Sequence, residues 1–89
     1  MQSSSPLILI TGSSDGIGLE TARQLARHGA EVILHGRRPE RVAAAQQSVE
    51  ALCGRSMPEP VLADLSSLSA ASALAAELAR RGSYPDVLI

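Results

Sequence analysis

A glycine-rich segment behind a short apolar run constrains the fold of this chain more than any other feature. Residues 7–10 are Leu-Ile-Leu-Ile, and residues 11–18 follow as Thr-Gly-Ser-Ser-Asp-Gly-Ile-Gly. The apolar run predicts a buried strand, and the glycines permit a tight turn into the helical pattern that begins near Ile17. A helix entered in this way directs unpaired N–H groups and its positive dipole end toward the turn. The segment therefore predicts an anion-binding turn between a strand and a helix.

Apolar runs alternate with segments of helical period along the rest of the chain, a pattern typical of strand–helix–strand units on a parallel sheet. Right-handed crossovers place four such strands in the order 3-2-1-4, with helices on both faces. The predicted fold class is α/β, a Rossmann-type doubly wound parallel sheet. Its predicted strands are Pro6–Thr11, Glu31–His35, Pro60–Ala63 and Asp86–Ile89; its helices start near Ile17, at Pro39 and after an N-cap at Ser66 or Ser67, and stop at His28-Gly29, Gly54 and Gly82.

Composition narrows the class of protein. The 89 residues suffice for one small domain, 1–89, and the open edge of its fourth strand indicates that the natural protein continues. A net charge of −1 gives no basic stripe for nucleic acid, and the first apolar run is too short for a signal or a membrane span. The lone Cys53 fits a reducing compartment, so we expect a cytoplasmic protein. No His, Cys or carboxylate pair has metal-ligand spacing, which predicts no metal site.

The spacing of residues 11–18 resembles the cofactor motif of the short-chain dehydrogenase/reductase family, Thr-Gly-x-x-x-Gly-[Ile/Leu]-Gly. The resemblance continues through residues 25–32, 36–38 and 64–65. Residues 20–22, 28–30 and 64–68 look most like the branch with retinol dehydrogenases and protochlorophyllide reductases. The resemblance to the family implies a nicotinamide dinucleotide cofactor and a homo-oligomeric parent protein. The cofactor-binding residues that we assign on this basis are Gly12, Ser13, Ser14, Gly16, Ile17, Gly18, Arg37, Arg38, Asp64 and Leu65.

Each glycine of the motif has a separate expected task. Gly12 allows the sharp turn, Gly16 lets the backbone approach a pyrophosphate, and Gly18 lets the helix lie against the strand. Ser13 and Ser14 line the turn, where their hydroxyls are candidates for bonds to phosphate oxygens. Neither serine has a neighbouring base in the sequence that would make it a nucleophile.

The end of the second strand favours NADP(H). NAD-selective proteins carry an acidic residue there for the ribose hydroxyls, whereas this chain has Arg37 and Arg38, which suit a 2′-phosphate. Glu40 lies in the first turn of the next helix, where the dipole explains it. Asp15 occupies a position where many NADP-binding members of the family carry Arg or Lys, and NAD(H) stays open as the alternative.

The sequence allows two roles for Asp64, contact with the adenine or capping of a helix. For His35 it indicates only a minor role in cofactor binding. Asp64 follows the third strand, and members of the family use the equivalent carboxylate to accept from the adenine amino group. The alternative is that Asp64 caps the helix that starts near Ser66. His35 ends the second strand beside the expected adenine side, and we expect at most an indirect contact with the cofactor.

Hydride transfer in this family needs a tyrosine as acid/base and a lysine four residues later. This chain has no lysine, and Leu88 stands four residues after Tyr84, its only aromatic residue, so no catalytic residue is assigned. We therefore expect the NADP(H)-binding part of an oxidoreductase acting on an alcohol or carbonyl compound, inactive as an isolated chain. The alternative is a non-catalytic dinucleotide-binding module or an inactive remnant.

Overall fold

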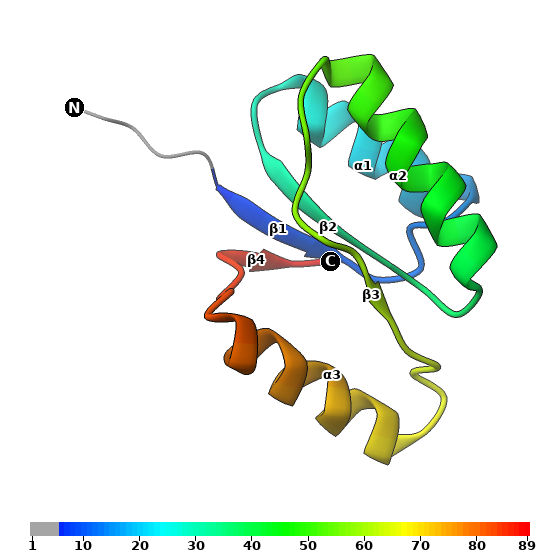
Figure 1. Ribbon diagram of the computed structural model, residues 1–89, viewed down its shortest axis with the longest axis vertical. Coiled ribbons are helices and arrows are strands. Elements are labelled where there is room, and N and C mark those ends of the chain that lie inside the picture. Colours follow the sequence, from blue (N-terminus) through cyan, green and yellow to red (C-terminus); the bar gives the residue numbers. More distant parts are fainter. Residues whose placement is uncertain (1–5) are drawn as a thin grey trace.

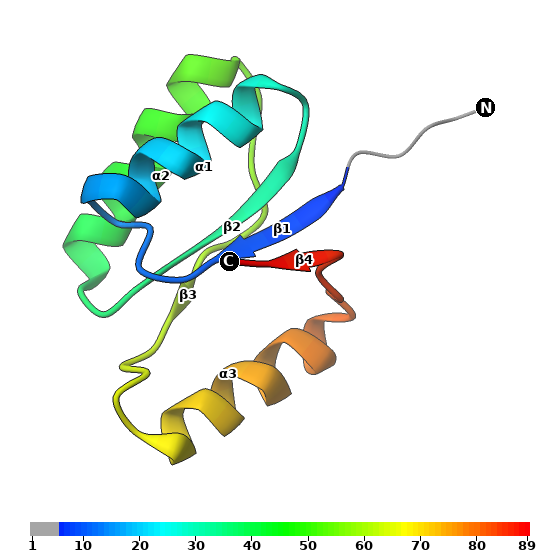
Figure 2. The same cartoon turned by 180° about the vertical axis from the view of Figure 1, so that it is seen from behind.

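A computed structural model describes residues 6–89 and confirms the predicted α/β class. The four strands are parallel and lie in the order β3-β2-β1-β4. Helices α1 and α2 cover one face of the sheet and α3 covers the other (Figures 1 and 2). The elements are β1 (Leu7–Ile10), α1 (Gly16–Arg27), β2 (Glu31–Gly36), α2 (Pro39–Cys53), β3 (Val61–Leu62), α3 (Leu68–Arg81) and β4 (Val87–Leu88).

The helix boundaries follow the predicted local signals. Pro39 occupies the first turn of α2, where its missing N–H costs nothing, and Gly54 ends that helix in the left-handed conformation. Ser67 is the N-cap of α3, since its hydroxyl accepts from the backbone N–H of Ala70 at 3.1 Å. The choice between Ser66 and Ser67 is thereby settled, and Gly82 ends α3 as predicted.

Three strands are shorter than predicted, and β2 is longer by one residue. Only Val61 and Leu62 pair with β2, opposite His35 and Gly36. The register places β3 beside the C-terminal end of β2, so Pro60, which has no N–H to donate, lies outside the ladder. This offset brings the chain after β3 close to the end of β2, where the glycine turn also lies.

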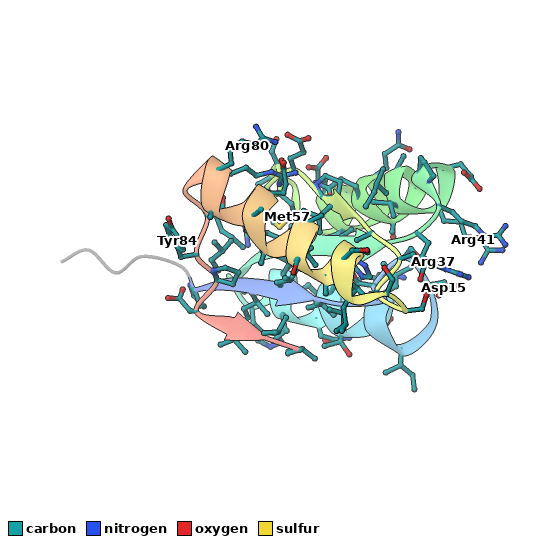
Figure 3. All side chains as sticks on the ribbon, turned by 90° about the horizontal axis from the view of Figure 1, so that it is seen from below. Asp15, Arg37, Arg41, Met57, Arg80 and Tyr84 are labelled. Carbon is teal, nitrogen blue, oxygen red and sulfur yellow. The ribbon has the colours of Figure 1, made fainter. Side chains whose placement is uncertain are left out.

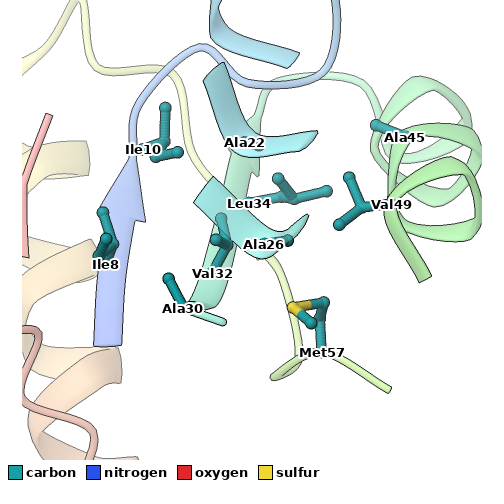
Figure 4. Packing of buried hydrophobic residues seen from close by; sticks show 10 residues of the cluster. All are labelled: Ile8, Ile10, Ala22, Ala26, Ala30, Val32, Leu34, Ala45, Val49 and Met57. Atoms are coloured by element: carbon teal, nitrogen blue, oxygen red, sulfur yellow. The ribbon is translucent and has the colours of Figure 1, made fainter. Parts of the chain in front are cut away.

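Alternate residues of β1 and β2 enter two separate hydrophobic clusters, as the pleat of a strand requires. Small alanines let α1 lie close to the sheet, and Figure 4 shows Ala22 and Ala26 beside the strand residues. Toward α1 and α2 the buried residues are Ile8, Ile10, Ala22, Ala26, Ala30, Val32, Leu34, Ala45, Val49 and Met57. Toward α3 they are Leu9, Ile33, Val61 and Leu78.

The outer strand β4 is held to β1 at both of its ends. Asp86 accepts from the Leu7 N–H through its carboxylate at 2.8 Å and donates its own N–H to the Leu7 carbonyl at 2.7 Å. At the other end, both the N–H and the hydroxyl of Thr11 donate to the Ile89 carbonyl, at 2.8 and 2.9 Å. Both residues of β4 are exposed. None of the helices formed by residues 6–89 has the length and hydrophobicity that a bilayer crossing requires.

Candidate dinucleotide-binding site

The turn between β1 and α1 depends on glycine in two ways. Gly12 and Gly16 have φ angles of 61° and 59°, a region that strains other residues, and a Cβ on either would meet nothing within 4 Å. Gly18 is different, because a Cβ there would overlap the Gly12 carbonyl oxygen and lie 2.9 Å from its carbon. The predicted task of Gly18 is thus refined: it lets α1 lie directly against the turn that follows β1.

Ser13 belongs to the frame of this turn. Its side chain is fully buried, and its hydroxyl donates to the Ile10 carbonyl at 2.8 Å. The same oxygen accepts from the His35 N–H at 2.8 Å, while the Ser13 N–H donates to the His35 carbonyl at 2.8 Å. The polar groups of Ser13 are therefore committed to β1 and β2, and its hydroxyl does not face a phosphate as the sequence had suggested.

The N-terminus of α1 is not capped by a side chain. Asp15 is the N-cap residue and has extended backbone angles, yet its carboxylate makes no capping hydrogen bond. The carboxylate instead accepts from the Arg41 guanidinium at 3.0 Å. Ile17, in the first turn of α1, is 87% exposed. The first turn thus keeps its amide dipoles directed outward, the arrangement that favours an anionic ligand.

A pocket of about 290 Å³ lies beside this turn, at the C-terminal ends of β1 and β2. This is the end of an open parallel sheet where ligands of doubly wound proteins bind. Figure 3 shows Asp15, Arg37 and Arg41 together at one end of the molecule, with Tyr84 at the opposite end. The pocket is lined by Gly12, Ser14, Asp15, His35, Gly36, Arg37, Arg38, Arg41 and Leu65.

The charges around the pocket are mostly positive. Three arginines line it, and Asp15 is the single carboxylate among the lining residues. Arg37 also lies 3.9 Å from the Asp64 carboxylate, just outside the pocket. Hydrogen bonds from the side chain and backbone of Ser66 lower the pKa of Asp64, and the Arg37 charge lowers that pKa further. Because both groups are exposed, the pair contributes little to the stability of the fold.

Asp64 forms a turn and does not cap α3. Its Oδ1 accepts from the Ser66 N–H at 3.1 Å, two residues along, while Ser67 makes the capping bond. The capping alternative for Asp64 is therefore wrong. Asp64 is exposed beside the pocket, and Leu65 lines the pocket wall. The assignment of Asp64 to the adenine amino group stays a prediction.

His35 is the residue whose importance the sequence did not reveal. It is 5% exposed, and its Nδ1 accepts from the Gly12 N–H at 2.9 Å. The ring proton therefore lies on Nε2, which donates to the Ala63 carbonyl at 2.8 Å. One imidazole thus joins the glycine turn to the chain after β3. A histidine at the end of a strand was the available signal, but nothing in the sequence identified its partners.

Substitutions at His35 are expected to separate its two bonds. His35→Asn keeps an acceptor near the Nδ1 position, and His35→Gln keeps a donor near the Nε2 position. His35→Leu removes both and leaves two backbone groups unpaired, at a cost of about 1–3 kcal/mol for each buried one. Urea denaturation should therefore rank Leu as the least stable. The amide NMR signal of Gly12 should shift in the leucine and glutamine variants and stay nearest to its wild-type position in the asparagine variant. Equal shifts in all three variants would contradict the assigned geometry.

The structure brings together half of the sequence-assigned residues around the pocket: Gly12, Ser14, Arg37, Arg38 and Leu65. Gly16, Ile17 and Gly18 lie in the adjoining turn and first helical turn, and Ser13 lies buried behind it. Arg41 lines the pocket although it was not assigned. A larger pocket of about 410 Å³ lies between β3 and α3, on the opposite face from α1, and none of the assigned residues lines it.

A strand, a glycine turn and an uncapped helix beside a pocket form the arrangement by which doubly wound α/β proteins of the Rossmann type bind nucleotides. The family model for short chain dehydrogenases matches residues 6–89, and the chain belongs to this family. An uncharacterised oxidoreductase of Emericella nidulans is 46% identical over 71 residues, which are 79% of this chain and 26% of that protein. An uncharacterised oxidoreductase of Escherichia coli is 41% identical over 75 residues, 84% of this chain and 29% of that protein.

Solved structures of the same family superpose closely. L-Sorbose reductase from Gluconobacter frateurii, in complex with NADPH and L-sorbose, has a TM-score of 0.83 at 31% identity, covering 99% of this chain and 33% of that one. A metagenomic short-chain oxidoreductase in complex with NADP has a TM-score of 0.80 at 36% identity, covering 96% and 38%. The chain thus spans between a quarter and two fifths of the length of these proteins. The narrower resemblance to retinol dehydrogenases stays a prediction.

Proposed function

We propose that this chain binds NADP(H) and forms the cofactor-binding part of an oxidoreductase that moves hydride between nicotinamide and an alcohol or carbonyl compound. The observation that carries the proposal is the pocket at the ends of β1 and β2, where Arg37, Arg38 and Arg41 converge beside the first turn of α1. Guanidinium groups suit a 2′-phosphate through charge-assisted bonds, and the helix N-terminus suits a pyrophosphate. The NADPH and NADP complexes of the two similar structures support the same cofactor.

The glycine turn is shaped for the close approach of a phosphate. Space stays open around the Cα atoms of Gly12 and Gly16, where a Cβ would meet nothing within 4 Å. Asp15, the N-cap residue of α1, pairs with Arg41 and makes no hydrogen bond to the helix amides. We assign the pyrophosphate to the amides at this turn, the 2′-phosphate to the arginines, and the adenine to the side bounded by Asp64 and Leu65. When bound, the nicotinamide ring supplies the hydride chemistry.

A second candidate function is a dinucleotide-binding module without catalysis of its own. It is favoured by the sequence of the 89 residues, which contains no lysine to accompany a catalytic tyrosine. Tyr84 is 71% exposed and lies at the end of the molecule opposite the arginines (Figure 3). For the 89-residue chain itself, we therefore expect cofactor binding without turnover.

Titration of the 89-residue chain with NADPH and with NADH tests the proposal. We expect saturable binding of both cofactors, with NADPH bound at least about ten-fold more tightly because of its extra phosphate. Nicotinamide fluorescence reports binding directly, because the chain has no tryptophan and one tyrosine. Circular dichroism on the same sample establishes that the chain is folded. A folded chain that binds neither cofactor would refute the proposed function, and one that prefers NADH would refute the assignment to NADP(H).

A further inference from the structure

Arg41 is a cationic residue at the end of a helix where anionic residues are ordinarily favoured. It lies in the first turn of α2, and the N-terminal end of a helix dipole disfavours a cation. Its guanidinium nevertheless reaches the pocket that Arg37 and Arg38 line. The side chain is about half exposed, so hydrophobic burial does not explain its position. Its one close charged partner among the described residues is Asp15, at 3.0 Å.

Asp15 is equally unusual for its position. Aspartate at an N-cap ordinarily accepts from the backbone N–H groups of the first turn, which stabilises the helix by about 1 kcal/mol. Asp15 makes no such bond, and its carboxylate lies instead across the turn against Arg41. The two residues are 26 positions apart, and the pair connects the N-cap of α1 with the first turn of α2.

We propose that Arg41 is a specificity-determining residue for the 2′-phosphate and that Asp15 is the carboxylate with which this phosphate competes for the guanidinium. Asp15 holds the guanidinium at the pocket while no anion is present, and the arriving 2′-phosphate competes with that carboxylate for Arg41. This inference rests on the proposed function, since it specifies how that same pocket discriminates NADPH from NADH.

The proposal predicts opposite effects for the two members of one ion pair. Arg41→Gln removes a charge from the 2′-phosphate site and should weaken NADPH binding about ten-fold, with a much smaller effect on NADH. Asp15→Ala removes the competing carboxylate and should tighten NADPH binding several-fold. Arg41→Gln should weaken NADPH binding more strongly in the Asp15→Ala background than in wild type, because Arg41 is then no longer shared with a carboxylate.

The experiment measures dissociation constants of the four proteins of this double-mutant cycle for NADPH, NADH, 2′,5′-ADP and 5′-AMP. The adenosine phosphates isolate the 2′-phosphate from any effect of the nicotinamide. Arg41→Lys keeps the charge and should recover most of the NADPH affinity. Arg27→Gln is the matched charge control, since Arg27 is exposed at the last turn of α1 and far along the helix from the pocket. Thermal unfolding verifies that each variant is folded.

The outcomes distinguish this inference from the proposed function. If wild type binds neither NADPH nor NADH, the proposed function fails and the inference fails with it. If wild type prefers NADPH but Arg41→Gln leaves the NADPH/NADH ratio unchanged, only the role of Arg41 is overturned. Equal weakening of NADPH and NADH binding would show that Arg41 supports the shape of the site and does not distinguish the two cofactors, which would also overturn its proposed role. A selective loss that Arg41→Lys recovers and Arg27→Gln does not reproduce would establish the proposal.

Discussion

Replacing Gly18 by alanine is expected to abolish dinucleotide binding with a single added methyl group. The new Cβ would overlap the Gly12 carbonyl oxygen and lie 3.0 Å from the Ser13 Cα. Both are backbone atoms of the turn, so relief requires moving α1 away from the end of β1. A misplacement of about 1 Å costs an active site as much as about a hundred-fold in rate, and we expect a loss of affinity of at least that size for both NADPH and NADH.

Helix propensity makes the same substitution informative about stability. Alanine is favoured over glycine inside a helix by about 1 kcal/mol, so propensity alone would stabilise the variant. Any loss of stability therefore reports the collision, and we expect a net loss of about 1–3 kcal/mol in urea denaturation. Gly82→Ala is the control: it adds the same methyl group where nothing lies within 4 Å. Its left-handed φ of 72° costs stability, yet cofactor affinity should persist. Normal binding by Gly18→Ala would refute the role assigned to the turn.

Reversing the charge at Arg37 is expected to move the cofactor preference from NADPH toward NADH. Arg37→Asp removes a guanidinium from the pocket and places a second carboxylate beside Asp64, now 3.9 Å from the Arg37 guanidinium. A 2′-phosphate is then repelled, whereas the hydroxyls of an unphosphorylated ribose find an acceptor. We expect NADPH affinity to fall about a hundred-fold and the NADPH/NADH ratio to invert, as measured by nicotinamide fluorescence.

Arg80→Asp is a close control for this prediction. Arg80 pairs with Glu77 on α3, so its reversal also sets two carboxylates side by side, away from the residues that line the pocket. Its effect on the NADPH/NADH ratio should be negligible. Arg37→Gln, which removes the charge without reversing it, should give an intermediate ratio. An unchanged ratio in Arg37→Asp would show that the 2′-phosphate binds elsewhere.

Local patterns were sufficient to predict the architecture of this chain. The apolar runs, the helical periods and the stop signals are features of a few consecutive residues, and each depends on backbone sterics or capping. Ser67 and Gly82 bound α3 for such local reasons. Crossover handedness then leaves little freedom, which is why the order β3-β2-β1-β4 followed from the order of the elements along the chain.

The strand, the glycine turn and the helix that follows it could be predicted from a few consecutive residues, because the conformations of Gly12 and Gly16 are local properties. The hydrogen-bond and ion-pair partners of the side chains around this turn depend on the tertiary structure. The bonds of His35 to Gly12 and Ala63 join positions 23 and 28 apart, and the Arg41–Asp15 pair joins positions 26 apart. Such partners are chosen by the packing of whole elements, since parallel strands and their helices bring the ends of distant segments to one edge of the sheet.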